Sequence, residues 1–92
     1  MSYNQGRVVD WHRFDPAEWH IEYDVNKLAA HQVGEWEAAE VIWNGFEVRP
    51  NQRRHGANRY QFLGRTDAGR PLKLIVHVSG ARSMRVITGW RI

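Results

Sequence analysis

The sequence contains no cysteine. This absence excludes disulfide bonds, cysteine-ligated zinc, iron–sulfur clusters and thiol nucleophiles. The sequence also lacks any apolar run close to the ~20 residues that span a bilayer, and it does not open on a signal-peptide pattern. With 92 residues it is too short for a large two-domain enzyme. These absences favour one soluble domain, which we expect to be cytoplasmic.

Acidic residues are scarce in the second half of the chain. Residues 49–92 contain one acid, Asp67, and ten Lys or Arg residues, whereas residues 1–48 hold nine of the ten acids. The formal net charge of +3 therefore hides a strong asymmetry. Such a basic half can bind a polyanion or an acidic protein partner, or it can be a sheet whose outer face is solvated by arginine. Both interpretations stay open on charge alone.

The spacing of apolar residues predicts helices first and strands second. Asp15 opens an Asp-Pro-Ala-Glu sequence that is typical of a helix start. Gly34 and Gly45 bracket a longer helix. From residue 46 onward the apolar period is two, and short glycine-containing links imply an antiparallel meander. The main predicted elements are a short strand at 20–23, helices at 25–31 and 35–44, and strands at 46–49, 59–65, 72–78 and 84–91.

This order of elements indicates an α+β fold. We expect the N-terminal short strand and the helices to pack on one face of a C-terminal four-stranded antiparallel meander. The domain is expected over residues 21–92. An arm over residues 1–20, in which a short helix can form, is expected to precede it.

Period two assigns the strand residues to two faces of the meander. The set expected to face the helices is Tyr60, Phe62, Leu72, Leu74, Val76, Val78, Met84, Val86, Thr88 and Trp90. The opposite face collects Arg59, Arg65, Lys73, His77, Arg85 and Arg91, interrupted by Leu63, Ile75 and Ile87. A basic surface with an apolar floor fits single-stranded nucleic acid or an acidic partner segment. The alternative is a solvated sheet on which arginine stems cover aliphatic neighbours.

Short motifs follow one another between residues 21 and 91. They are Ile21-Glu22-Tyr23-Asp24, His31-Gln32-Val33, Glu37-Ala38-Ala39-Glu40-Val41, Tyr60 to Gly64, Gly69-Arg70-x-Leu72, Ile75-Val76-His77 and Met84-Arg85-Val86-Ile87-Thr88. In order and spacing they resemble the BrnT-type toxins, the ribonuclease components of bacterial toxin–antitoxin pairs. The resemblance implies a RelE-like fold, metal-independent RNA cleavage and a DNA-binding antitoxin partner. Two departures are Gln32 in place of the family's glycine and Trp90 in place of its arginine.

Metal-independent RNA cleavage uses the ribose 2′-hydroxyl as the nucleophile, so the protein supplies a base, an acid and cations for the developing charge. His77, with Arg65 and Arg85 on the same predicted face, is the best catalytic candidate. The alternative is a strand histidine on a wet face with no catalytic role. The other basic residues expected to bind RNA are Arg53, Arg54, His55, Arg59, Lys73 and Arg91.

No cofactor or metal is expected, because the five histidines show no ligand spacing and no phosphate-binding loop is present. The function that the resemblance to BrnT-type toxins implies is that of a toxin which cleaves RNA without a metal. The alternative is a non-catalytic RNA- or protein-binding module of the same fold. The departure at Trp90 motivates that alternative.

The chain is rich in tryptophan, with five residues. Trp36 and Trp43 lie seven positions apart on the helix predicted over 35–44. Their rings point away from the sheet if the opposite stripe, Ala38, Val41 and Ile42, faces it. We expect these two rings to bind a protein partner, either an antitoxin or a second copy of the chain in a homodimer. The alternative is that the aromatic residues of the N-terminal arm fold back and cover them.

Overall fold

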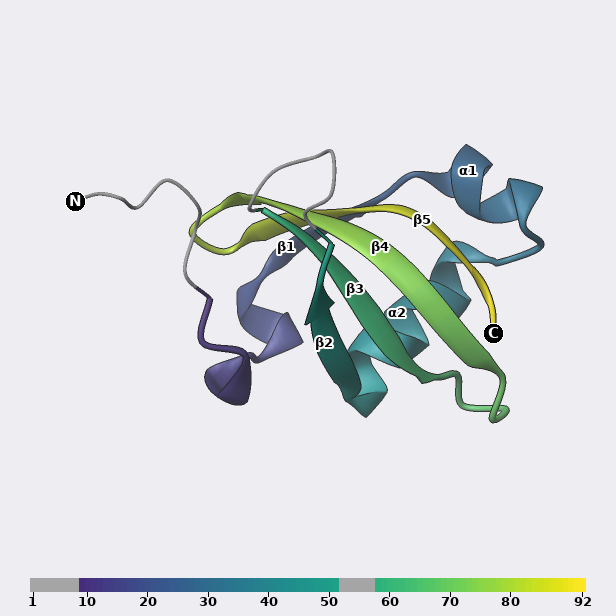
Figure 1. Cartoon of the computed structure of the whole chain (residues 1–92), viewed down its shortest axis with the longest axis horizontal. Coiled ribbons are helices and arrows are strands. Elements are labelled where there is room, and N and C mark those ends of the chain that lie inside the picture. Colours follow the sequence, from purple (N-terminus) through teal and green to yellow (C-terminus); the bar gives the residue numbers. More distant parts are fainter. Residues whose placement is uncertain (1–8, 52–57) are drawn as a thin grey trace.

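The computed structural model describes residues 9–51 and 58–92 (Figure 1). The elements are two 3-10 turns, η1 Trp11–Arg13 and η2 Pro16–Glu18, strand β1 His20–Tyr23, helices α1 Val25–Ala30 and α2 Glu35–Asn44, and strands β2 Phe46–Pro50, β3 Arg59–Arg65, β4 Pro71–Gly80 and β5 Ser83–Arg91. These strands form one sheet in the order β1-β5-β4-β3-β2, and both α-helices lie on one side of it (Figure 1). The predicted α+β class is confirmed.

Local sequence signals place the helices where they were predicted. The Asp24 carboxylate accepts a hydrogen bond from the Lys27 N–H at 3.1 Å and so caps α1. At the start of α2, the Glu37 carboxylate accepts one from the Gly34 N–H at 3.0 Å. Gly45 ends α2 with a φ of 97°, in the region that favours glycine. The predicted bounds of α2 are confirmed, and those of the strands agree to within about two residues.

β1 occupies a different place from the one predicted. Instead of packing on a face of the meander, it forms one edge of the sheet and runs parallel to β5. The His20 N–H donates to the Arg82 carbonyl at 2.8 Å, and the Asp24 N–H donates to the Val86 carbonyl at 2.9 Å. β1 thereby pairs with backbone groups of β5 that would otherwise lie along an open edge.

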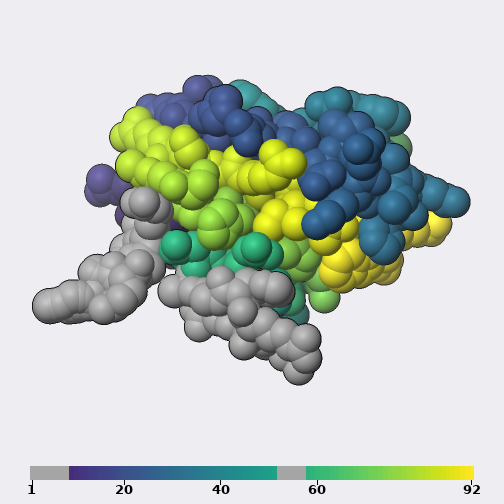
Figure 2. Space-filling model, turned by 90° about the horizontal axis from the view of Figure 1, so that it is seen from above, coloured from purple at the N-terminus to yellow at the C-terminus, as the bar shows by residue number. Residues whose placement is uncertain are grey.

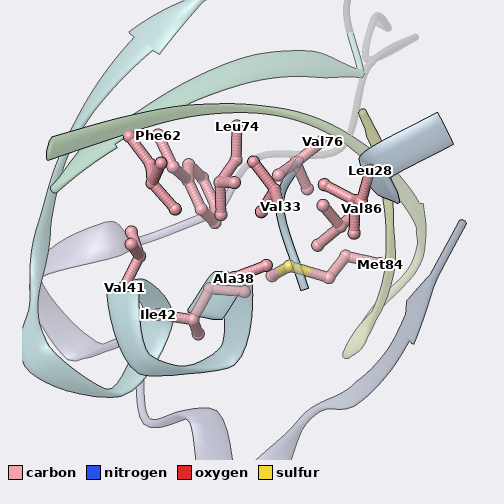
Figure 3. Close-up of a cluster of buried hydrophobic side chains, with 11 residues drawn as sticks. Leu28, Val33, Ala38, Val41, Ile42, Phe62, Leu74, Val76, Met84 and Val86 are labelled. Atoms are coloured by element: carbon pink, nitrogen blue, oxygen red, sulfur yellow. The ribbon is translucent and has the colours of Figure 1, made fainter. Parts of the chain in front are cut away.

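The core lies between the helices and the sheet. Figure 3 shows residues of α2 on one side of the buried cluster and residues of β3 and β4 on the other. The members of this cluster are Leu28, Val33, Ala38, Val41, Ile42, Phe62, Leu72, Leu74, Val76, Met84 and Val86. The predicted inward stripe of α2 is therefore confirmed. So is the predicted helix-facing set of β3, β4 and the first half of β5.

A β-bulge changes the side-chain pattern in the second half of β5. Val76 pairs with Val86, whereas Ile75 pairs with Thr88, so Ile87 is an extra residue in the ladder. Beyond the bulge the alternation is reversed. Gly89 pairs with Leu74 on the helix side, and Trp90 pairs with Lys73 on the outer face, the face of the sheet turned away from the helices.

The bulge overturns three of the predicted positions. Thr88 and Trp90 do not face the helices, and Arg91 does not lie on the outer face, because it pairs with the buried Leu72. The physical reason for the reversed pattern is that the helix-side position next to Leu74 has room only for a glycine, Gly89. A Cβ atom at Gly89 would lie 2.7 Å from Cδ2 of Leu74 and 3.3 Å from Cδ2 of Leu28. A residue without a side chain therefore lets α1 pack closely on β5 at this point.

Residues before β1 pack on the helix side of β2 and β3. The Trp11 ring lies 5.2 Å from the Phe62 ring, centroid to centroid, and Phe46 stacks on Phe62 at 3.9 Å. We call this group the aromatic cluster; its members are Trp11, Phe14, Trp19, Phe46, Tyr60 and Phe62. The cluster extends the core beside α2. Figure 2 shows the N-terminal part of the chain, in purple and blue, on one side of the green and yellow strands.

Candidate functional site

Cross-strand register brings side chains from four strands into one row on the outer face. Arg59 on β3 pairs with His77 on β4, His77 pairs with Arg85 on β5, and Arg85 pairs with Glu22 on β1. The side chains of directly paired residues are neighbours on the same face. We call Arg59, His77, Arg85 and Glu22 the His77 row.

His77 is a neutral hydrogen-bonding group in this row. Its Nδ1 accepts a hydrogen bond from Nε of Arg59 at 3.2 Å. Burial lowers the pKa of His77, and the positive charge of Arg59 lowers it further, so the imidazole is uncharged near pH 7. Because Nδ1 accepts, the ring proton is on Nε2. In this arrangement His77 can donate a hydrogen bond to RNA but has no free lone pair with which to accept a proton.

Arg85 is held by two carboxylates. Its Nη1 lies 3.3 Å from Oε1 of Glu22, and its Nη2 lies 3.7 Å from Oδ2 of Asp24. The pKa of Glu22 is lowered, first by its hydrogen bond with His20 at 3.2 Å and also by Arg85, although some burial opposes the shift. The Arg85 side chain is 46% exposed. It can therefore reach a phosphate, but only by sharing or leaving these carboxylates.

Arg65 does not lie beside His77, contrary to the prediction. It pairs with Pro71 at the far end of β4, which places it about 20 Å from His77 along the strand. Its Nη1 donates to the Gly69 carbonyl at 2.9 Å. The β3–β4 register puts Arg59, predicted only to bind RNA, in the position next to His77. A direct contact of Arg65 with a group bound at His77 is thus excluded.

Several cations on the outer face have no carboxylate within 4 Å among the described residues. They are Arg59, Arg65 and Lys73. All ten acids of the sequence lie within residues 9–51 and 58–92, so no carboxylate side chain is missing from this comparison. By contrast, Arg49 on β2 pairs with Glu47 at 2.9 Å. The uncompensated positive charge of the outer face therefore follows β3 and β4.

Apolar and aromatic side chains lie between and beside these cations. The middle row of the outer face is Gln61, Ile75 and Thr88, and the end row is Leu63, Lys73 and Trp90. Ile75 is buried, and Trp90 is half-buried. The outer face thus combines cations with an apolar floor. Contrary to the prediction, it contains Trp90 and does not contain Arg91.

The other residues predicted to bind RNA do not all lie on the outer face. Arg59 and Lys73 are on the outer face, whereas Arg91 is on the helix side. Arg53, Arg54 and His55 lie outside the described residues. Their roles stay predictions.

Trp36 and Trp43 point away from the sheet and are 66% and 60% exposed. The alternative in which the N-terminal arm covers them is wrong, because the arm's rings pack against Phe46 and Phe62 instead. The Trp36 ring lies over Gly34 and borders a hollow of about 510 Å³ between α1 and α2. Trp43 borders a smaller hollow of about 210 Å³ beside the aromatic cluster. Both rings are therefore accessible in the free protein.

Sequence reasoning missed the bond from Arg59 to His77 and the two carboxylates on Arg85. Glu22 and Asp24 carry no local signal for this contact, because β1 pairs in parallel with a strand far along the chain. The sequence did contain a signal for the bulge in β5. Gly89 is a glycine inside a strand, a feature that often marks a bulge or a close approach.

Within residues 9–51 and 58–92, no three histidine or acidic side chains come together as a metal site would require. Neither α-helix of this part of the chain has the length and apolar character needed to cross a bilayer.

Comparisons of the chain with protein-family models, with curated proteins and with solved structures found no match. The similarity to BrnT-type toxins therefore rests on the sequence motifs alone.

Proposed function

We propose that the outer face of the sheet binds single-stranded RNA. The observation that carries this proposal is the set of cations without carboxylate partners, Arg59, Arg65 and Lys73, on a face that also holds aliphatic and aromatic side chains. Single-stranded RNA offers phosphates to the cations and unstacked bases to the apolar groups. An acidic peptide would satisfy the cations, but it would use the exposed part of Trp90 only through additional apolar side chains, whereas every nucleotide carries a base that can stack on the ring. RNA therefore fits the whole face better.

RNA cleavage by a BrnT-type, RelE-like toxin is the second candidate, and the His77 row together with the sequence motifs favours it. In that reaction the 2′-oxygen attacks phosphorus, its proton passes to a base, and the bond to the 5′-oxygen breaks as that oxygen takes a proton from water. His77 can accept the 2′-hydroxyl proton only at Nδ1, where Arg59 now donates. Cleavage therefore requires Arg59 to move onto a phosphate first. The free protein supports binding more directly than cleavage.

Lys73→Ala and Arg59→Ala are each expected to weaken binding of a labelled single-stranded RNA about five- to tenfold at about 0.1 M salt, because each removes one phosphate contact. The slope of log affinity against log salt should fall in magnitude by about 0.7 for each variant. Fluorescence anisotropy over a salt series measures both quantities. Arg82→Ala is the matched control, because Arg82 already pairs with Glu18 at 3.3 Å near the β4–β5 turn. Unchanged affinity in both outer-face variants would rule out this binding face.

The same RNA, incubated without metal and separated on a gel, distinguishes cleavage from binding. Products with a 2′,3′-cyclic phosphate that disappear in His77→Ala, while binding persists, would support the ribonuclease. RNA that is bound but stays intact at high protein excess would support the non-catalytic module.

For a protein partner, we infer that the outward face of α2 is the docking surface. Trp36 and Trp43 supply two accessible rings, and Glu35 and Glu40 on the same helix add negative charge. The partner segment is therefore expected to be basic and apolar. α2 and the outer face lie on opposite sides of the sheet, so RNA and this partner do not compete for one surface. The similarity to BrnT-type toxins makes an antitoxin the expected partner.

The double variant Trp36→Ser/Trp43→Ser is expected to bind a purified candidate antitoxin, chosen as a short DNA-binding protein from a neighbouring reading frame, at least about 100-fold more weakly than the wild type. The circular dichroism spectrum should not change, because both rings are exposed in the free protein. Isothermal titration calorimetry measures the affinity, and Lys73→Ala on the other side of the sheet is the control. If the double variant keeps wild-type affinity, partner docking on α2 is wrong. Loss of a homodimer in sedimentation experiments would point to a second copy of the chain instead.

A further inference from the structure

Trp90 stands at one end of the outer face, in contact with two groups suited to a nucleotide. The bulge at Ile87 turns Trp90 away from the helices and places it opposite Lys73. Nζ of Lys73 lies 5.9 Å from the centroid of the Trp90 ring. The His31 ring, at the end of α1, lies 5.8 Å from the Trp90 ring, centroid to centroid. A cation and an imidazole are thus within reach of anything bound on this ring.

We propose that Trp90 is the position at which a base of single-stranded RNA stacks, with Lys73 on the adjacent phosphate and His31 beside the base. This inference rests on the proposed RNA binding and assigns one residue of the outer face to the base. Stacking of a base on an aromatic side chain contributes about 1–3 kcal/mol and tolerates any base. Lys73 is available for a phosphate, because no described carboxylate holds it and its flexible stem can move from the ring to the phosphate.

The position of Trp90 is unusual for a tryptophan whose role is only to pack. A tryptophan in β5 would bury most area on the helix side, where Met84 and Val86 lie. The bulge places Gly89 on that side and leaves Trp90 half-buried on the basic face. The core therefore contains no aromatic side chain at this point of β5, and the Trp90 ring lies beside the Lys73 ammonium group on the outer face.

The spacing along β4 also orients the RNA. Lys73 and His77 are on the same face and about 13 Å apart along the strand. A base stacked on Trp90 therefore directs the following phosphates along β4 toward Arg59 and His77. One position of a bound oligonucleotide should depend on Trp90, and the positions over the His77 row should not.

Anisotropy titrations with short labelled RNAs test this assignment, using a series in which one abasic nucleotide is moved through the sequence. Trp90→Leu is expected to weaken binding of intact RNA about 5- to 150-fold, and Trp90→Phe should recover most of the loss. One abasic position should weaken wild-type binding by a similar factor and have no further effect in Trp90→Leu. Trp43→Leu, which alters an exposed tryptophan on the other side of the molecule, should bind as the wild type does.

The outcomes separate this inference from the proposed function. If the wild type binds RNA and Trp90→Leu binds every oligonucleotide equally well, the stacking role is wrong but the RNA-binding face stands. If the wild type binds no RNA, both fail. Should Trp90→Leu not fold, 2-aminopurine placed at each position of the RNA reports stacking in the wild type through loss of its fluorescence. A series in which no position is quenched overturns the assignment.

Discussion

Trp11→Ala is expected to lower the free energy of unfolding by about 3 kcal/mol, the largest effect of a single substitution that we predict. Trp11 contacts two rings of β3 and two other rings of the N-terminal arm. Its centroid lies 5.2 Å from those of Phe62 and Tyr60, 5.5 Å from that of Phe14 and 6.0 Å from that of Trp19. Removing it leaves a cavity against the fully buried Phe62 and detaches the arm from β2 and β3. Urea unfolding followed by circular dichroism measures the change.

Trp43→Ala is the matched control for this substitution, because it removes the same side chain from an exposed site. Trp43 is 60% exposed, so its loss should change the free energy of unfolding by no more than about 0.5 kcal/mol. If the two variants are equally stable, the aromatic cluster does not stabilise the fold. In that case the arm would be an accessory to the domain and not part of its core.

Gly89→Val is expected to lower the free energy of unfolding by about 2–3 kcal/mol, because the added atoms overpack β5 against β4 and, at a longer distance, against α1. The new Cβ would lie 2.7 Å from Cδ2 of Leu74 and 3.0 Å from the Lys73 carbonyl oxygen. Relief requires the Leu74 side chain to move and β5 to shift relative to the β4 backbone, or the bulge to rearrange. Because Trp90 is the next residue, the variant should also lose RNA affinity beyond what its lower stability explains.

Alanine substitutions at two strand glycines give the control. At Gly80 a Cβ would meet only Ser83 atoms at 3.4 Å and 3.5 Å, which is ordinary contact. Gly80→Ala should therefore be nearly neutral, and Gly89→Ala should be destabilised by about 1 kcal/mol. Equal thermal midpoints for the two alanine variants would show that Gly89 is not required for close packing.

The sequence predicted those parts of the fold that depend on local periodicity. The helical repeat of Ala38, Val41 and Ile42 between two glycines predicts α2, and these three residues are buried as expected. His77 and Arg85 were placed on one face because strand residues alternate, and their register is direct. Such features depend on neighbouring residues only.

The parts that failed depend on pairings between distant segments. The apolar pair Val86-Ile87 and Gly89 interrupt the alternation in β5, but a periodic pattern does not show that Ile87 is the extra residue, because that depends on the pairing of β5 with β4. The choice between Arg59 and Arg65 as the neighbour of His77 depends on the register of β3 with β4, which alternation alone does not determine. The carboxylates on Arg85 depend on a parallel pairing with no local signature.

The pairing of β1 with β5 has a consequence for how the protein is made. β1, at residues 20–23, finds its partner only at residues 83–86, so this edge of the sheet cannot form while β5 is still being translated. Met84 and Val86 also complete the core around Leu28, so a nascent chain without β5 exposes that apolar surface. Contacts this distant in sequence form late and slowly. Folding is therefore expected to finish only after synthesis of β5, and until then the nascent chain is expected to expose an apolar surface that favours aggregation.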